Sequence, residues 1–351
     1  MKTFRARFLN FVLTCSLVAL SVGCATGSST RLSVISGESI ILAGETPAQL
    51  AFTPKQGQAV VVRSTYDARP DTVVYEEGKD YRVDYATRTI ARVSGSRIPD
   101  FTTNVLYGQK NFDHSKFPGF SNNPFFVYVD YVATKSVTWP VQANQATLLP
   151  KSAAKLKNGE ALRIVAYGDS ITAGGEATRP QLIFWQRWAD ALAAKYPAAK
   201  VTAINGATGG DATVQGLQRL QEKVIDAKPD LVVIGFGMND HNKNGVKIPD
   251  FEANLKSIIA QIREKTGAEV VLFSAFPPNP DWMHSSHSMD QYAAATEKVA
   301  REVNCAFVDV FHNWNVFADL KKPGDMLANN INHPNDFGHW IYFRVLSAMG
   351  L

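Results

Sequence analysis

The stretch LRIVAYGDSIT at residues 162–172 decides the fold. Its first six residues, 162–167, form an apolar run that is typical of a buried strand in a parallel sheet. Gly168, Asp169 and Ser170 follow directly, so the sequence predicts a serine hydroxyl at the carboxyl end of that strand. Open α/β sheets keep their ligand sites at this edge. A lone serine is a poor nucleophile, and it therefore needs a base and oxyanion donors from elsewhere in the chain.

A strand–helix rhythm continues from this stretch to the end of the chain. Strand-like apolar runs recur at 162–167, 200–206, 230–236, 269–275 and 305–310, and amphipathic segments occupy 182–196, 213–227, 249–266, 289–303 and 336–348. This alternation indicates a parallel sheet that helices cover on both faces. The sequence therefore predicts a three-layer, flavodoxin-like α/β domain over residues 161–351.

Residues 32–139 follow a different pattern. Strand-like segments rich in β-branched and aromatic residues, or alternating between apolar and polar residues, occur at 59–66, 80–85, 89–93 and 125–132. The second and third of these segments are adjacent and predict a hairpin with one buried and one solvated face. We expect an antiparallel, jelly-roll-like β-sandwich over residues 32–139, followed by a proline-containing linker at 140–160.

The first 23 residues have the layout of a bacterial secretion signal, with basic residues before an apolar stretch. The run LSVGC at 20–24 resembles a lipobox, after which the cysteine is lipidated and becomes the new N-terminus. We therefore expect a signal peptide at 1–23, lipidation of Cys24, a tether at 24–31 and an outer-membrane lipoprotein of a Gram-negative cell. Ordinary secretion with cleavage nearby, or a retained N-terminal anchor, are the alternatives.

The charge of the chain argues against a nucleic-acid partner. The 36 basic and 32 acidic residues give a net charge of +4. Lys2, Arg5 and Arg7 all lie in the predicted signal peptide, whose removal would leave a net charge of +1. A nucleic-acid-binding protein would be expected to carry a basic patch, and the sequence indicates none. Contact with a membrane is expected only through the lipid on Cys24.

Three further blocks of polar residues complete the pattern that Ser170 begins. They are NGATGGDAT at 205–213, GMND at 237–240 and HPN at 333–335. In a parallel sheet these blocks arrive at the same carboxyl edge as Ser170, and such convergence is what a catalytic constellation requires. Each block alone is also consistent with a turn, or with the start of a helix that Asn335 caps.

These four blocks, in this order, resemble those of the SGNH (GDSL-type) hydrolases. Over residues 160–351 the resemblance implies a serine ester hydrolase that acts through an acyl-enzyme and needs no cofactor. It implies that Ser170 is the nucleophile and His333 the general base. The oxyanion hole would consist of the Ser170 amide, the Gly210 amide and the Asn239 side chain. Fixed donors of this kind stabilise the charge that acyl transfer builds on a carbonyl oxygen by about 3–4 kcal/mol each.

One position departs from the family pattern. The family usually has an aspartate three residues before the histidine, and this chain has Asn330 there. In a serine protease, the change from aspartate to asparagine in this role costs about 10⁴ in turnover. Three alternatives follow: Asn330 orients His333 through its amide oxygen, a more distant acid such as Asp325 or Asp336 does so, or a main-chain carbonyl does.

The order of the two halves bears on the substrate. A β-sandwich before an SGNH domain resembles the layout of some bacterial acetyl esterases that act on plant polysaccharides, so acetylated carbohydrate is the expected substrate. The aromatic segment 112–120 is consistent with a sugar platform and equally with packing between the halves. A lipid esterase or thioesterase, and a non-catalytic polysaccharide-binding lipoprotein, are the alternatives.

Trp282, His284 and His287 follow the fourth predicted strand of the α/β half and are expected near the cleft. Histidines in such a place suggest metal ligands. The sequence around them lacks a compact carboxylate–histidine spacing, however, and no metal site is predicted.

Overall fold

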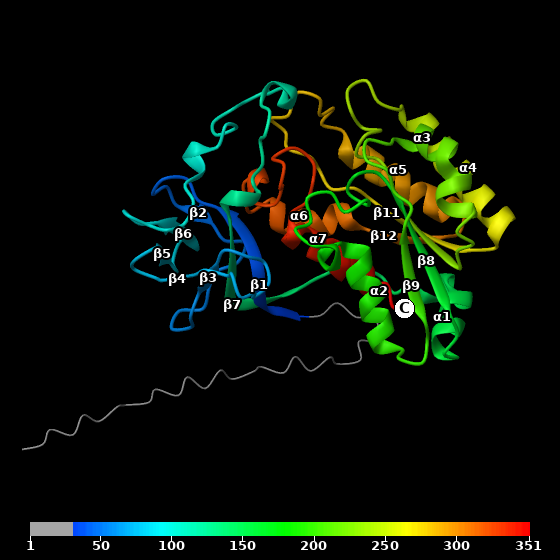
Figure 1. The fold of residues 1–351 in the computed structure, drawn as a ribbon, viewed down its shortest axis with the longest axis horizontal. Coiled ribbons are helices and arrows are strands. Elements are labelled where there is room, and N and C mark those ends of the chain that lie inside the picture. Colours follow the sequence, from blue (N-terminus) through cyan, green and yellow to red (C-terminus); the bar gives the residue numbers. More distant parts are fainter. Residues whose placement is uncertain (1–30) are drawn as a thin grey trace, which may run out of the picture.

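The computed structural model describes residues 31–351 (Figure 1). We call the antiparallel part from β1 to β7, residues 31–138, the β half, and the part from β8 to the end, residues 162–351, the α/β half. The predicted signal peptide at 1–23, Cys24 and most of the tether at 24–31 lie outside the described residues, so export and lipidation stay predictions. Within residues 31–351, none of the helices combines the length and the apolar character needed to cross a membrane.

A five-stranded parallel sheet forms the centre of the α/β half, with the strand order β12-β11-β10-β8-β9. The strands are β8 (Leu162–Gly168), β9 (Val201–Asn205), β10 (Leu231–Gly235), β11 (Glu269–Phe273) and β12 (Ala306–Val308). Every residue of β10 is buried, as expected for a strand that helices cover on both faces. The structure confirms the predicted parallel sheet.

Helices cover both faces of this sheet. On one face α2 packs against α7, while α3, α4 and α5 pack in sequence on the other (Figure 1). The helices are α1 (Pro150–Lys157), α2 (Phe184–Lys195), α3 (Thr213–Leu220), α4 (Ile248–Thr266), α5 (Met289–Glu302), α6 (Val310–Ala318) and α7 (Asp336–Ser347). A short π-helix, Gln221–Ile225, continues α3. This three-layer arrangement confirms the predicted fold class.

The sequence did not predict α1 or α6. Pro150 suggested a linker, but it occupies the first turn of α1, where proline is favoured because its missing N–H costs no hydrogen bond. The strand-like run 305–310 ends at Val308, and Asp309 then caps α6 by accepting a hydrogen bond from the His312 N–H at 3.1 Å. A helix of nine residues directly after a strand gave no separate amphipathic signal.

Two antiparallel sheets make up the β half, as predicted for a β-sandwich. Their strand orders are β1-β7-β3-β4 and β2-β6-β5. The strands are β1 (Arg31–Ile41), β2 (Ala48–Gln49), β3 (Val61–Arg63), β4 (Val74–Tyr75), β5 (Tyr81–Asp84), β6 (Thr89–Arg92) and β7 (Phe126–Thr138). The predicted hairpin is β5 with β6, and Tyr81 pairs with Arg92 across it.

Aromatic side chains join the two halves. Trp139, directly after β7, packs edge-on against Phe317 of α6 at 5.0 Å and stacks on Trp340 of α7 at 5.2 Å between ring centroids. The chain at 140–160 follows this contact and contains α1. The predicted domain boundaries at 139 and 161 stay predictions.

A buried ion pair also joins the halves. Lys321 Nζ lies 2.5 Å from Glu38 Oε1, and both side chains are 0% exposed. Glu38 accepts further hydrogen bonds from the Tyr131 hydroxyl at 2.6 Å and from the Ala51 N–H at 2.8 Å. This carboxylate therefore has partners on both oxygens, which a buried charge requires.

Removal of the lysine is expected to destabilise the fold strongly. Lys321→Ala leaves Glu38 buried without its counter-charge, and we expect a loss of about 3–5 kcal/mol in the free energy of unfolding, measured by urea denaturation. The control is Lys256→Ala, which breaks a 2.6 Å pair with Glu302 whose side chains are 40% and 42% exposed. The control should leave the midpoint almost unchanged. Equal losses in both variants would contradict this account.

Candidate active site

Ser170 lies in a tight turn at the carboxyl end of β8. A Cβ on Gly168 would lie 2.1 Å from the Gly235 carbonyl oxygen, so β8 and β10 approach too closely here for any side chain. Asp169 is buried and accepts a hydrogen bond from the Ile171 N–H at 2.9 Å, which holds the turn. Burial raises the pKa of Asp169 to about 7.

The structure brings together the two residues predicted as nucleophile and base. His333 Nε2 lies 2.8 Å from Ser170 Oγ, within the range for a nucleophile and its base. Burial lowers the pKa of His333 to about 4, so the ring is neutral at pH 7. In the neutral tautomer that carries its proton on Nδ1, Nε2 is free to accept a hydrogen bond from the Ser170 hydroxyl.

The second polar block lies beside the serine. The Thr208 N–H donates to the Gly168 carbonyl at 3.0 Å, which anchors the loop after β9 to the end of β8. A Cβ on Gly209 would lie only 3.8 Å from the Ser170 Cβ. Gly210 adopts a φ of +84°, a conformation that favours glycine, and has open space where a Cβ would stand.

The third block is tied to the second. Asn239 Nδ2 donates to the Asp211 carbonyl at 2.9 Å, which places Asn239 against the loop that carries Gly210. Asp240 accepts hydrogen bonds from the N–H and the hydroxyl of Thr213 at 2.9 and 2.5 Å. Burial raises the pKa of Asp240. These contacts fix both loops as one unit, and the role of Gly210 and Asn239 as oxyanion donors stays a prediction.

Asn330 does not orient His333. Its Oδ1 lies 3.3 Å from Asn122 Nδ2 and 3.4 Å from Asn279 Nδ2, and both amides donate to it. His333 Nδ1 is buried and has no hydrogen-bond partner among residues 31–351. The first of the three alternatives, in which Asn330 orients His333, is therefore wrong, because the amides of two other segments hold the Asn330 oxygen.

The two distant acids do not replace it. The Asp325 carboxylate accepts a hydrogen bond from the Ile41 N–H at 2.9 Å. The Asp336 carboxylate accepts from the N–H and the hydroxyl of Thr178 at 2.9 and 2.7 Å. Neither carboxylate accepts a hydrogen bond from His333 Nδ1, and no main-chain carbonyl of the described residues does so. The described chain therefore forms a serine–histidine dyad.

Asn329 holds the His333 segment, a role that was not predicted from the sequence. Its Oδ1 accepts hydrogen bonds from three backbone N–H groups: Ile331 at 3.0 Å, Asn332 at 2.9 Å and His333 at 2.9 Å. Asparagine commonly makes such side-chain-to-backbone bonds in turns, so the NNINH run was an available signal. Asn329 is thus a positioning residue for the base.

A second histidine, also missed by the sequence analysis, packs near the base. His339 of α7 is 0% exposed, and its Nε2 lies 3.4 Å from the Gly175 carbonyl oxygen. Burial lowers the pKa of His339 to about 3. A Cβ on Gly175 would lie 3.3 Å from His333 Nδ1, so the Gly175 backbone separates two neutral imidazoles.

Three known esterases are similar to parts of this chain. An acetylxylan esterase of Geobacillus stearothermophilus is 26% identical over 208 residues, which cover 54% of this chain and 94% of that protein. An arylesterase of Vibrio mimicus is 33% identical over 138 residues, or 38% of this chain and 66% of that protein. The crystal structure of a two-domain esterase active on acetylated mannans is 24% identical with a TM-score of 0.49, and the match covers 58% of this chain and 54% of that one.

The parallel sheet and the serine–histidine pair at its carboxyl edge define a serine ester hydrolase. Residues 166–341 match the GDSL-like Lipase/Acylhydrolase family, and the chain belongs to that family. This confirms the predicted family and the predicted class, a carboxylic ester hydrolase. The match covers the α/β half and none of the β half.

Substitutions of Asn329 and of Asn330 are expected to have very different effects on kcat. Asn329→Ala removes the acceptor for three N–H groups of the His333 segment, and a base displaced by about 1 Å costs on the order of 100-fold in kcat with little change in KM. Asn329→Asp keeps the acceptor oxygen and should restore most of kcat. Asn330→Asp should stay within about threefold of the wild type, because its carboxylate faces Asn122 and Asn279 rather than His333.

Steady-state kinetics on an activated ester, with circular dichroism as a check on folding, measures both effects. A large gain in kcat for Asn330→Asp would show that a carboxylate at this position reaches His333. Equal losses in Asn329→Ala and Asn329→Asp would remove the positioning role of Asn329.

The pH profile should reflect the buried base. His333 must be neutral to accept the proton of Ser170, and its pKa is lowered from 6.5 to about 4. The value of kcat/KM should therefore fall only as the pH drops through about 4, and should be level from about 5 to 7, because this ratio reports the pKa of the free enzyme's base. An acid limb centred near 6.5 would contradict this prediction.

Proposed function

We propose that this protein removes acetyl groups from acetylated carbohydrate, with Ser170 forming an acyl-enzyme. The observation that carries the proposal is the 2.8 Å contact between His333 Nε2 and Ser170 Oγ at the carboxyl edge of the sheet. A similar protein, at 26% identity, is an acetylxylan esterase, and this supports an acetylated sugar as the substrate.

The reaction proceeds in two steps, acylation of Ser170 and deacylation. Ser170 Oγ attacks the ester carbonyl while its proton passes to His333 Nε2, and the carbonyl oxygen becomes an oxyanion. The amides of Ser170 and Gly210 and the side-chain amide of Asn239 donate hydrogen bonds to that oxyanion. The C–O bond to the sugar then breaks, and the sugar oxygen takes the proton from His333, which leaves an acetyl group on Ser170.

Water completes the cycle. His333 Nε2 takes a proton from a water molecule as its oxygen attacks the acetyl carbonyl. The second oxyanion is stabilised by the same donors. Its collapse returns the proton from His333 to Ser170 Oγ and releases acetic acid, which loses its proton to solvent. No carboxylate stabilises the His333 imidazolium in either step, because His333 Nδ1 has no partner among residues 31–351.

The test compares the purified protein with its Ser170→Ala variant. We expect hydrolysis of p-nitrophenyl acetate by the wild type and a loss of at least about 10⁴-fold in the variant. We also expect release of acetate from acetylated xylan. Equal rates in the two proteins would favour a non-catalytic polysaccharide-binding protein.

A chain-length series identifies the acyl group. Among p-nitrophenyl esters from acetyl to palmitoyl, kcat/KM should be highest for acetyl and fall as the chain lengthens. A maximum at a long acyl chain would overturn the proposed substrate and favour a lipid esterase or thioesterase.

A further inference from the structure

Two loops from opposite halves of the chain are pinned together close to the His333 segment. The Phe112 N–H donates to the Asp281 carbonyl at 2.9 Å, and the Met283 N–H donates to the Phe112 carbonyl at 3.1 Å. These bonds form a parallel bridge between Phe112 and Trp282. A buried apolar cluster surrounds the bridge and consists of Leu106, Phe112, Trp282 and Ile331. The loops are thus held by backbone bonds and by packing, rather than by exposed side chains alone.

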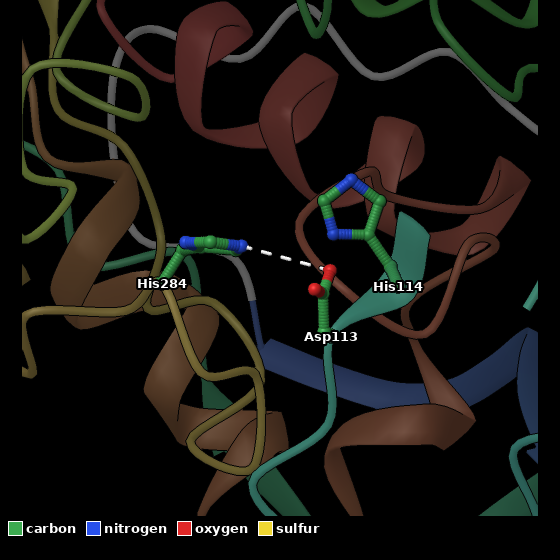
Figure 2. A group of neighbouring side chains, drawn as sticks. All are labelled: Asp113, His114 and His284. Atoms are coloured by element: carbon green, nitrogen blue, oxygen red, sulfur yellow. Dashed lines mark ion pairs between the residues drawn. The ribbon is translucent and has the colours of Figure 1, made fainter. Parts of the chain in front are cut away.

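Three side chains with metal-binding atoms flank this bridge (Figure 2). Asp113 and His114 directly follow Phe112, and His284 follows on the other loop. One ligand atom from each of the three lies within 4.8 Å of the other two. Figure 2 shows the Asp113 carboxylate between the two imidazoles, and His284 Nε2 lies 3.8 Å from Asp113 Oδ1.

Hydrogen bonds hold two of these side chains in place. The N–H and hydroxyl of Ser115 donate to Asp113 Oδ1 at 3.1 and 2.8 Å and lower the pKa of that carboxyl. Trp282 Nε1 donates to His114 Nδ1 at 3.0 Å, so Nδ1 carries no proton in the neutral ring. A metal on Nδ1 would take the place of the indole N–H.

We propose that Asp113, His114 and His284 bind one divalent transition-metal ion, with Zn²⁺ as the preferred occupant. Two imidazoles and one carboxylate are a donor set that suits Zn²⁺, Co²⁺ and Ni²⁺, whereas Mg²⁺ prefers oxygen ligands alone. Water would fill the fourth position of a tetrahedral zinc ion. The ion would link the β half to the α/β half outside the Ser170 site.

The geometry needs two adjustments, and the first is displacement of the Trp282 indole N–H from His114 Nδ1. A tetrahedral Zn²⁺ ion with bonds of about 2.0–2.1 Å separates its ligand atoms by about 3.3 Å. The 3.8 Å distance between His284 Nε2 and Asp113 Oδ1 must shorten by about 0.5 Å to reach this value. The His284 side chain is 46% exposed and can rotate, while that of Asp113 is 21% exposed and held by Ser115. The exposed side also gives the ion access from solvent.

Calorimetric titration of the purified, metal-free protein with Zn²⁺ and with Mg²⁺ tests the site. We expect one Zn²⁺ per chain, and an affinity that His284→Ala lowers at least about tenfold. Mg²⁺ should give no binding. Zn²⁺ should raise the melting temperature of the wild type and not that of His284→Ala, because an ion bound only by the folded state stabilises it.

The matched control is His312→Ala. His312 is 75% exposed and lies 2.7 Å from Asp309, so it forms a histidine–carboxylate pair without a second imidazole. This variant should bind Zn²⁺ like the wild type. The proposal is overturned if wild type and His284→Ala bind Zn²⁺ equally, if His312→Ala alone loses binding, or if only the heat of dilution appears. All readouts are of binding and stability, so they are independent of the esterase assay.

Discussion

The 2.8 Å contact between Ser170 and His333 depends on the segment 321–335, which lies between two helices and carries the base. Ser170 follows directly from a buried strand, so the sheet fixes its position. His333 has no such support, because its segment is largely irregular. The buried pair of Glu38 and Lys321 holds the start of this segment against β1, at a point where neither charge has access to water. The β half therefore contributes to the position of the base, although none of the residues proposed for the dyad or the oxyanion hole lies in it.

Asn122 of the β half supports the same segment further along. It is 0% exposed, its N–H donates to the Ala328 carbonyl at 2.6 Å, and its Nδ2 donates to the Leu327 carbonyl at 2.9 Å. The next residue, Asn123, donates to Glu176 on the loop after Ser170 at 2.8 Å. Two consecutive residues of the β half thus contact the loops on both sides of the dyad. The β half therefore supports the segments that carry Ser170 and His333 through hydrogen bonds.

The fold and the dyad could be predicted because their signals are local. Buried parallel strands appear as apolar runs, and Ser170 and His333 each lie in a short motif with a fixed place relative to a strand or helix. The hydrogen-bond partners of Asn330 could not be predicted in this way. Its partners Asn122 and Asn279 are 208 and 51 residues away in the chain. That Asp113 and His114 lie close to His284 could not be predicted from the sequence for the same reason. The residues near His284 in sequence do not include the other two proposed ligands.

The missing carboxylate and the low pKa of His333 have a common consequence for catalysis. A paired carboxylate would favour the charged ring and raise its pKa, whereas burial without a partner lowers it to about 4. The ring is then ready to accept a proton at any pH above about 5, but it is a weaker base, and transfer from Ser170 has less driving force. Stabilisation of the transition state must therefore come more from the oxyanion than from the imidazolium. The loops that carry Gly210 and Asn239, the predicted oxyanion donors, are joined by the hydrogen bonds of Asp240 with Thr213 and of Asn239 with the Asp211 carbonyl, and donors held in this way would need little reorganisation during the reaction.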